Sequence, residues 1–353
     1  MNSLTVGFIG NQPISQDLIT SIRVIGEFKG KQELFKQQSP QVLKTLRQTS
    51  IIQSAESSNR LEGITAPQAR IRELVAEKTT PRNRSEQEIA GYRDVLQTIH
   101  ARHADIPFTA NVVRQLHRDL FQFLPSEGGV WKHTDNDITE TLPDGTVFVR
   151  FSPVKAHLTA THMQGLHERY TSIREQNAVE PLLLIASYVF DFLCIHPFID
   201  GNGRMARLIT LLLLYHEGYE VGRYISLEHI IEQTKEGYYD VLYRSSQGWH
   251  EGAHSLIPWW EYFLGVVLLQ AYREFEDRAG IITGGRGGKS AMVKDVIARL
   301  PQHFQFADVQ NAAPGVSRPT INRVLRELRE AGRIRCPKGG RDAVWEKIEH
   351  HHD

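Results

Sequence analysis

Twelve consecutive residues, from His196 to Arg207, combine side chains that bind phosphate, bind a divalent cation and move a proton. They read His-Pro-Phe-Ile-Asp-Gly-Asn-Gly-Arg-Met-Ala-Arg. Gly201 and Gly203 permit unusual backbone angles and the close approach of an anion. A helix that begins at Asn202 would present unpaired N–H groups and its positive dipole end to that anion. The spacing therefore predicts an anion-binding site.

The charged side chains of the run suit the same anion. Arg204 and Arg207 are three positions apart, so we expect both guanidinium groups on one face of the helix, within reach of one polyphosphate. Asp200 offers a hard oxygen to Mg²⁺, which usually binds one or two carboxylates plus substrate phosphates. His196 is placed to take a proton from an attacking hydroxyl near pH 7. A solvent-exposed turn with surface ion pairs would explain any one of these residues, but not their joint spacing.

The run lies between two segments that are apolar on nearly every side, as in Leu182 to Ile185 and Leu211 to Leu214. We expect a buried central pair of helices at residues 181–195 and 202–218, with the polar run held between them. A Pro-Asp-Gly turn followed by alternating β-formers predicts a hairpin at residues 141–151. Further helices are expected at residues 39–76, 84–103, 110–123 (after a Thr109 N-cap), 156–175, 229–246 and 258–278.

The twelve-residue run resembles the signature of the Fic-domain family, His-x-Phe-x-Asp/Glu-Gly-Asn-Gly-Arg-x-x-Arg, at every specified position. The resemblance extends over roughly residues 85–270 in helix order and hairpin placement. Fic proteins are helical enzymes, most of which transfer AMP from Mg-ATP to a Ser, Thr or Tyr hydroxyl of a protein and release pyrophosphate. The resemblance implies that His196 is the base, that Asp200 holds Mg²⁺, that Gly201, Asn202 and Gly203 bind the α-phosphate region, and that Arg204 and Arg207 hold the β- and γ-phosphates.

Two further segments resemble parts of the same family. The hairpin resembles the flap that clamps the target segment by strand addition and closes over the nucleotide. Tyr238 and Tyr239 resemble residues on the adenine side of the site. A plain surface hairpin and two core tyrosines are the alternatives, and the sequence leaves both open. The flap residues are Val147, Phe148, Val149 and Arg150.

An upstream stretch, Ser58-x-x-x-Glu62-Gly63, resembles the inhibitory-helix motif of the family. The resemblance implies that Glu62 pairs with Arg207 and blocks the γ-phosphate, which gives an autoinhibited enzyme. A carboxylate competes directly with phosphate for the same guanidinium group. An ordinary helix C-cap at Gly63 is the alternative.

The C-terminal segment resembles a winged helix-turn-helix domain. Helices are expected at residues 290–300, 306–313 and 318–331, with a turn at 314–317 and two short strands around a glycine turn at 333–345. DNA binding is its functional interpretation, and contact with protein, either the enzyme's own dimer or its target, is the alternative. The residues expected in a groove are Arg318, Thr320, Asn322 and Arg323, and those expected on phosphates are Arg335, Lys338 and Arg341.

Composition, charge and cysteine content narrow the classes of protein to which the sequence could belong. The 353 residues carry 41 Lys and Arg and 41 Asp and Glu, with 41% hydrophobic residues, as in an ordinary globular protein. Residues 281–353 hold 13 basic and 8 acidic residues, so only this part has a net charge, +5, that suits a polyanion. Two cysteines, Cys194 and Cys336, do not make a disulfide scaffold or a zinc site. The longest apolar stretch is far shorter than the roughly 20 residues that span a bilayer, so we expect a cytoplasmic protein with no membrane partner.

These patterns predict a mainly α chain, with a Fic helical core, a β-hairpin flap and a C-terminal winged helix-turn-helix domain. The expected boundaries are an N-terminal helical region at 1–84, with the inhibitory helix at about 50–64, a Fic catalytic domain at 85–280, a glycine-rich linker at 281–288 and the winged-helix domain at 289–353.

The leading hypothesis is a protein adenylyltransferase that uses ATP and Mg²⁺, with another protein or its own chain as substrate, and a homodimer as a possible assembly. Phosphorylating relatives lack the second glycine of the signature, so Gly203 favours AMP transfer. Removal of AMP is a second alternative within the family, because Glu62 could position a water. From a different class, the chain could be a DNA-binding regulator whose Fic domain senses nucleotide.

Overall fold

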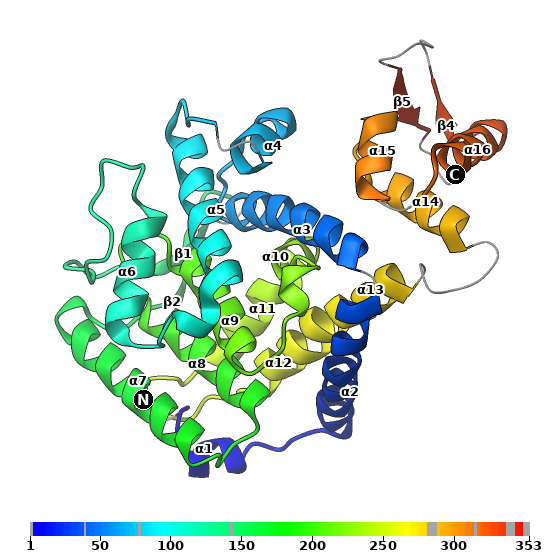
Figure 1. Ribbon diagram of the computed structural model, residues 1–353. Helices are drawn as coiled ribbons and strands as arrows, with labels where there is room; N and C mark the ends of the chain where they lie inside the picture. Colours follow the sequence, from blue (N-terminus) through cyan, green and yellow to red (C-terminus); the bar gives the residue numbers. More distant parts are fainter. Residues whose placement is uncertain are drawn as a thin grey trace.

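Two hydrophobic cores organise the chain (Figure 1). The computed structural model describes residues 3–38, 40–76, 79–141, 144–280, 288–313, 316–336 and 343–348. The first core contains side chains from Leu4 to Ala279, which come from both the expected N-terminal region and the expected catalytic domain, and the boundary between these two at residue 84 stays a prediction. The second core contains side chains from Met292 to Ile334. The sequence places the linker between them at 281–288; of these residues, 281–287 lie outside the described ones.

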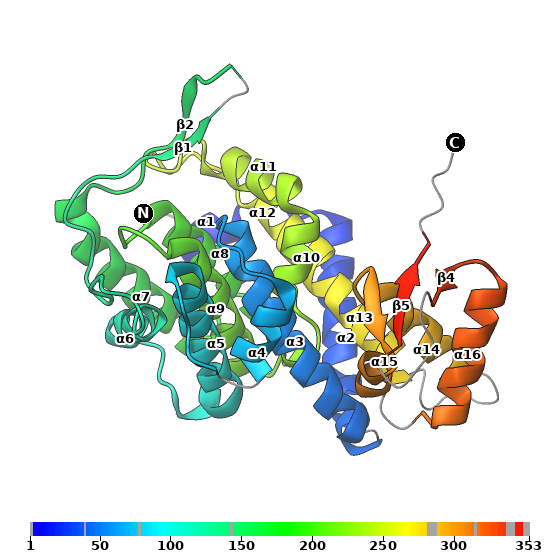
Figure 2. The same ribbon diagram turned by 90° about the horizontal axis from the view of Figure 1, so that it is seen from above.

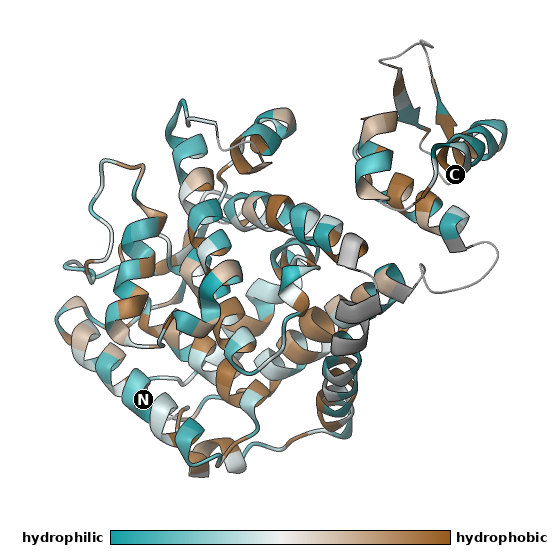
Figure 3. Ribbon diagram, in the orientation of Figure 1, coloured by the Kyte–Doolittle hydropathy of each residue, from teal (hydrophilic) through white to brown (hydrophobic). Residues whose placement is uncertain are grey.

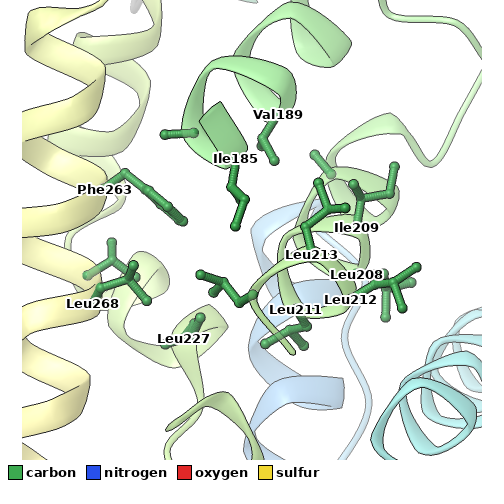
Figure 4. Packing of buried hydrophobic residues seen from close by; sticks show 14 of the residues in the cluster. Ile185, Val189, Leu208, Ile209, Leu211, Leu212, Leu213, Leu227, Phe263 and Leu268 are labelled. Carbon is green, nitrogen blue, oxygen red and sulfur yellow. The ribbon is translucent and has the colours of Figure 1, made fainter. Parts of the chain in front are cut away.

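The central pair of helices is α8 (Pro181–Ile195) and α9 (Asn202–His216). Figure 4 shows Ile185 and Val189 of α8 among the packed side chains of this core, together with Leu208, Ile209, Leu211, Leu212 and Leu213 of α9. Pro181 is in the first turn of α8, where its missing N–H costs nothing. Each fully buried Leu or Ile contributes about 1.5–3 kcal/mol, so this pair is a rigid support for the loop between the helices.

Further helices surround the pair, and Figure 3 shows hydrophobic and hydrophilic residues alternating along them, as expected of helices with one face on a core. Thr109 caps α6 through its side chain, as predicted. The helices that surround the central pair are α1 (Val6–Gly10), α2 (Gln16–Gln38), α3 (Pro40–Leu61), α4 (Gln68–Ala76), α5 (Arg84–Arg102), α6 (Ala110–Leu120), α7 (Thr159–Glu175), α10 (Leu227–Gln233), α11 (Lys235–Ser246), α12 (Ile257–Trp260) and α13 (Leu269–Gly280). Three short 3-10 turns accompany them: η1 (His103–Asp105), η2 (Ala156–Leu158) and η3 (Val221–Arg223).

The helix expected at 39–76 is interrupted at residues 62–67, between α3 and α4, and two other expected helices are less regular than the sequence predicts. The helix expected at 229–246 is divided at Thr234, whose hydroxyl bonds to the Ile230 carbonyl and lies 2.7 Å from the Tyr262 hydroxyl. The helix expected at 258–278 contains a π-helical segment, η4 (Glu261–Leu268). The side-chain bonds of Thr234 account for the first irregularity, and apolar spacing carries no signal for either.

A two-stranded antiparallel hairpin projects from the helical body (Figure 2). It consists of β1 (Ile138–Thr141) and β2 (Val147–Phe151), with an irregular register at Ile138. At its turn the Asp144 carboxylate accepts the Thr146 N–H and Gly145 has a positive φ of 84°. The turn residues 142 and 143 lie outside the described residues.

The second body has the order helix, strand, helix, helix, strand, strand. Its elements are α14 (Gly288–Arg299), β3 (His303–Gln305), α15 (Phe306–Ala312), α16 (Arg318–Glu330), β4 (Ile334–Arg335) and β5 (Val344–Lys347), and the antiparallel sheet has the order β3-β5-β4. Residues 314–315 of the expected turn at 314–317 and residues 337–342, which include Lys338 and Arg341, lie outside the described residues.

The second body lies beside α3 in both views (Figures 1 and 2), and α15 contacts α3. An ion pair links Arg72 of α4 to Asp308 of α15 at 3.0 Å. Across the described part of the chain, no helix has the length and apolar character needed to cross a membrane.

Candidate active site

The loop between α8 and α9 begins at His196, which ends α8 in the left-handed conformation with a φ of 51°. Its side chain is half-buried, and its Nδ1 lies 3.4 Å from the Leu193 carbonyl. Burial, reinforced by the positive charge of Lys132, lowers the pKa of His196 to about 4. The imidazole is therefore neutral near pH 7 and has the protonation state of a base.

The turn into α9 depends on Gly201, whose φ is 80° and whose missing side chain leaves room for Phe121. A Cβ at this position would lie 2.9 Å from the Phe121 ring. The Asn202 side chain points back into the loop: its amide oxygen accepts the Phe198 N–H at 2.9 Å and its amide nitrogen donates to the Phe198 carbonyl at 2.8 Å. Asn202 therefore braces the loop, and no side chain caps the N-terminus of α9, so the backbone N–H groups of its first turn could bind an anion.

The two arginines of the signature have different surroundings. The Arg204 side chain is only 1% exposed, and its Nη1 donates to Glu88 Oε2 of α5 at 2.7 Å. Its Nη2 lies 3.4 Å from Asp200 Oδ1, and its guanidinium group packs over the Phe121 ring. Arg204 thus ties α9 to α5, and its expected contact with the same polyphosphate as Arg207 stays a prediction. Glu88 is not among the residues that the sequence motifs single out, although an acid within the apolar face of α5 is a signal of a buried polar contact.

Arg207 is also buried, but its partners belong to α3. Its Nε donates to Ser58 Oγ at 2.8 Å, and its Nη2 donates to the Ser58 carbonyl at 2.9 Å and to Glu62 Oε1 at 2.7 Å. Burial alone would lower the pKa of Arg207, but the adjacent Glu62 carboxylate raises it above the ordinary value. The guanidinium group is fully charged and is held by Ser58 and Glu62.

Glu62 lies directly against the start of α9. A Cβ built on Gly203 would collide with the Glu62 carboxylate, so the glycine makes this approach possible. The Glu62 side chain is 33% exposed. Gly63 follows with a φ of 77° and donates its N–H to the Arg60 carbonyl, which is the C-cap expected as the alternative interpretation. The cap and the contact with Arg207 therefore occur together.

A row of buried serines attaches α3 to the rest of the site. Ser54 Oγ donates to Glu228 Oε2 at 2.7 Å and lies 2.9 Å from Ser226 Oγ. Glu228 also accepts the Tyr92 hydroxyl at 2.8 Å. The other serines of the row are Ser50, which donates to the Gly222 carbonyl, Ser57, which lies 3.2 Å from His229 Nδ1, and Ser58 on Arg207. Hydrogen bonds therefore supply much of the contact between the inner face of α3 and its neighbours.

The two tyrosines of α11 are placed differently. Tyr238 is buried next to Trp259 and Tyr262, and burial raises its pKa. Tyr239 is half-buried, and its hydroxyl donates to the Leu61 carbonyl at 3.2 Å. In the hairpin, Val147, Phe148 and Val149 are exposed. Arg150 of the same strand donates to Glu140 at 2.7 Å and to the Tyr239 carbonyl at 3.3 Å, which connects the hairpin to α11.

Asp200 is the acidic residue of the loop that a cation could use. Its side chain is 52% exposed, and its Oδ1 accepts the N–H of Gly201 at 2.5 Å. Among the described residues, no group of three or more His, Cys, Asp or Glu side chains forms a complete metal site. One exposed carboxylate beside an anion site fits Mg²⁺ that arrives with substrate phosphates, and it does not fit a resident structural metal.

The site is thus a short polar loop in a helical fold, placed at the N-terminus of α9, where backbone N–H groups favour an anion. Residues 107–214 match the Fic/DOC family model, so the chain carries a domain of the Fic/DOC family.

Solved structures share this fold. A Fic domain-containing signaling protein from Bacteroides thetaiotaomicron is similar over 72% of this chain and 96% of its own, with a TM-score of 0.60 and 22% identity. A Fic family protein from Desulfovibrio desulfuricans is similar over 96% of this chain and 98% of its own, with a TM-score of 0.60 and 21% identity. The Desulfovibrio desulfuricans structure therefore shares the fold of this chain over nearly its whole length.

Curated relatives are similar over shorter regions. A protein adenylyltransferase Fic from Culex quinquefasciatus is 25% identical over 212 residues, which are 58% of this chain and 39% of that protein. A Fido domain-containing protein from Dictyostelium discoideum is 40% identical over 57 residues, 16% of this chain and 40% of that protein. The chain thus spans about two fifths of the length of these relatives.

Proposed function

We propose that this protein is a protein adenylyltransferase, which moves AMP from ATP to a Ser, Thr or Tyr hydroxyl of a protein. The observation that carries the proposal is the position of a neutral, half-buried His196 on the same short loop as Asp200 and the start of α9. The names of the curated relatives support the same chemistry. An ATP-dependent enzyme also fits the cytoplasmic location that the sequence predicts.

In the proposed reaction, the target hydroxyl oxygen attacks the α-phosphorus of ATP while His196 takes its proton. The new O–P bond forms as the bond between the α-phosphorus and the bridging oxygen breaks, and pyrophosphate leaves. The N–H groups at the start of α9 stabilise the charge that develops on the α-phosphate. Asp200 would hold Mg²⁺, which supplies neutralisation of the phosphate charge.

Arg207 is the proposed ligand of the γ-phosphate, and Glu62 is its proposed inhibitor. The γ-phosphate oxygens and the Glu62 carboxylate bind the same guanidinium group, so binding of one excludes binding of the other. Arg204 contributes through the buried pair with Glu88, which fixes the start of α9. Relief of inhibition requires that Glu62 leave Arg207, and a carboxylate at this position also keeps AMP removal as an alternative activity.

The hairpin is the proposed docking strand for the target. The exposed side chains Val147, Phe148 and Val149 suit strand addition, in which main-chain bonds give affinity and side-chain pockets give specificity. Tyr239 is the better candidate of the two tyrosines for the adenine side, since Tyr238 is enclosed by Trp259 and Tyr262. The modified residue belongs to a partner protein or to a second copy of this chain in a homodimer.

Labelled nucleotide distinguishes the enzyme activities. Glu62→Gly protein is incubated with Mg²⁺ and ATP labelled at the α- or, separately, the γ-phosphate, and label on protein is followed. The proposal predicts label from the α position alone and none in the Glu62→Gly/His196→Ala variant. Label from the γ position alone would identify a phosphorylating relative instead, and no label with host lysate as target would contradict transfer.

DNA binding by the C-terminal body is the second candidate. We propose a winged-helix domain here because three helices and then the strands β4 and β5 follow one another in the order that the sequence predicts, with β3 as an additional strand that the sequence does not predict, and because α16 exposes Arg318, Asn322 and Arg323. Arg335 is bound by Glu346 at 2.7 Å, which reduces the free charge. Fluorescence anisotropy with labelled duplex DNA tests this. Binding that weakens with salt and is lost in Arg318→Ala/Arg323→Ala protein is expected, and binding unchanged in that variant contradicts it.

A further inference from the structure

One buried histidine of α6, outside the signature, contacts the signature loop. His117 lies parallel to the Phe198 ring, with a centroid separation of 3.6 Å, and stacks on Phe121 at 4.5 Å. The two phenylalanine rings enclose an imidazole that is only 4% exposed. His117 is therefore part of the floor under the turn from α8 to α9.

Both ring nitrogens of His117 have partners, and the partners fix the tautomer. Gly129 donates its N–H to Nδ1 at 2.8 Å, so Nδ1 carries no proton. Nε2 therefore carries the proton and donates it to the Asp200 carbonyl at 3.0 Å. One bond ends on the residue proposed to hold Mg²⁺, and the other ends on the segment that follows α6.

That segment is bound to the signature loop at further points. Lys132 donates its backbone N–H to the Pro197 carbonyl at 2.8 Å and its Nζ to the Ile195 carbonyl at 3.1 Å. Gly129 in turn is fixed by Arg114, whose Nε donates to the Gly129 carbonyl at 2.8 Å. Gly129 has a φ of 81°, and a Cβ there would lie 2.7 Å from the Arg114 carbonyl oxygen, so the backbone is closely packed.

We propose that His117 is a positioning residue of the transfer site, which holds the Asp200 carbonyl through its Nε2–H and thereby sets the direction of the Asp200 carboxylate and the turn at Gly201. The inference rests on the proposed function for its kinetic consequence, but not for its structural one. A histidine that served packing alone would need only the stack between the two rings. Here the two hydrogen bonds of the imidazole connect two backbone segments that border the site, one at Asp200 and the other at Gly129.

Three substitutions separate the stack from the two hydrogen bonds. His117→Gln retains an amide donor near the position of Nε2, His117→Asn retains an acceptor near the position of Nδ1, and His117→Phe retains the ring. His167→Phe is the matched control, because His167 is also buried among aromatic rings but lies on α7 with Tyr188 as its hydrogen-bond partner.

The first readout is the apparent affinity for Mg²⁺, taken from calorimetry of ATP binding at a series of Mg²⁺ concentrations in a Glu62→Gly/His196→Ala background that cannot turn over. Loss of a group that orients a metal ligand typically costs about 10–100-fold in metal affinity or activity. We expect the apparent Mg²⁺ affinity to fall by about tenfold or more in the Asn and Phe variants, with the Gln variant and the His167→Phe control within about threefold of the parent.

The second readout is amide hydrogen exchange of residues 197–203, which requires no activity. Faster exchange in the Asn and Phe variants, with protection retained in the Gln variant, is expected. Equal Mg²⁺ affinity and equal exchange in all variants overturn the proposal, and so does equal loss in the Gln and Asn variants, which would indicate packing alone. If the Phe variant does not fold, the contrast between Gln and Asn still decides. Absence of AMP transfer by the Glu62→Gly protein would contradict the proposed function and leave these two readouts intact.

Discussion

The Oε1 atom of Glu62 lies 2.7 Å from Nη2 of Arg207, although the two residues are 145 positions apart in the sequence. The contact joins the end of α3 to the first turns of α9. It places a carboxylate at the guanidinium group that we propose for the γ-phosphate, and on this proposal the strength with which α3 is held would determine how often that group is available to ATP.

Ser54→Ala is expected to activate the enzyme in part. The substitution removes the hydroxyl that donates to Glu228 and leaves a buried carboxylate oxygen with one partner fewer, which costs about 1–3 kcal/mol. Because α3 is then held less strongly, incorporation of AMP from α-labelled ATP should rise several-fold, although by less than in Glu62→Gly protein. Ser172→Ala, at an exposed position on α7, is the control. A lower melting temperature without any rise in incorporation would show that the serine row does not control inhibition.

Glu88→Ala is expected to be strongly destabilising. It leaves the buried Arg204 without its main carboxylate partner, and breaking a buried ion pair from one side typically costs about 3–5 kcal/mol. Glu27→Ala breaks the exposed pair with Arg23 on α2 and should have little effect. Urea unfolding of both variants measures the difference. Equal midpoints for the two would mean that the Arg204 pair does not hold α9 to α5.

Acid is expected to unfold the protein before its carboxylates are fully protonated. Burial lowers the pKa of His100 to about 3 and that of His167 to about 4, whereas both are near 6.5 in an unfolded chain. The unfolded state therefore binds more protons than the folded state below pH 6.5. The free energy of unfolding falls as the pH is lowered from there, by at most about 1.4 kcal/mol per pH unit for each histidine.

Melting temperatures between pH 8 and pH 4.5 test this expectation. The wild-type protein should lose stability steadily below pH 6.5. His100→Gln removes one titrating ring and should make that decline shallower. Parallel curves for the two proteins would contradict the assignment of His100 as a buried neutral group.

The sequence predicts the part of the site that is local in the chain. The two apolar helices, the loop from His196 to Gly201 and the N-terminus of α9 follow from residue types within one short segment. The Ser58-x-x-x-Glu62-Gly63 pattern predicts the pair with Arg207 through the family resemblance, and the structure contains that pair.

The contacts that the sequence does not predict are those between distant segments. Polar serines at positions 50, 54, 57 and 58 are typical of a solvent-exposed helix face, and only the position of Glu228 and its neighbours makes that face buried. Glu88 and His117 belong to helices that the sequence predicts, but their partners are 116 and 83 positions away. Tertiary packing decides such contacts, and local propensity contains no information about them.

The most direct test of the account is the rate of AMP incorporation from α-labelled ATP by wild-type and Glu62→Gly protein at equal concentrations. If Glu62 competes with the γ-phosphate for Arg207, the variant should incorporate AMP at least about tenfold faster, since loss of one charge-assisted contact of about 1.5–3 kcal/mol changes an equilibrium by that order. Equal rates in the two proteins, with both lost in His196→Ala protein, would retain transfer and contradict inhibition by Glu62. No incorporation by either protein would contradict the account as a whole.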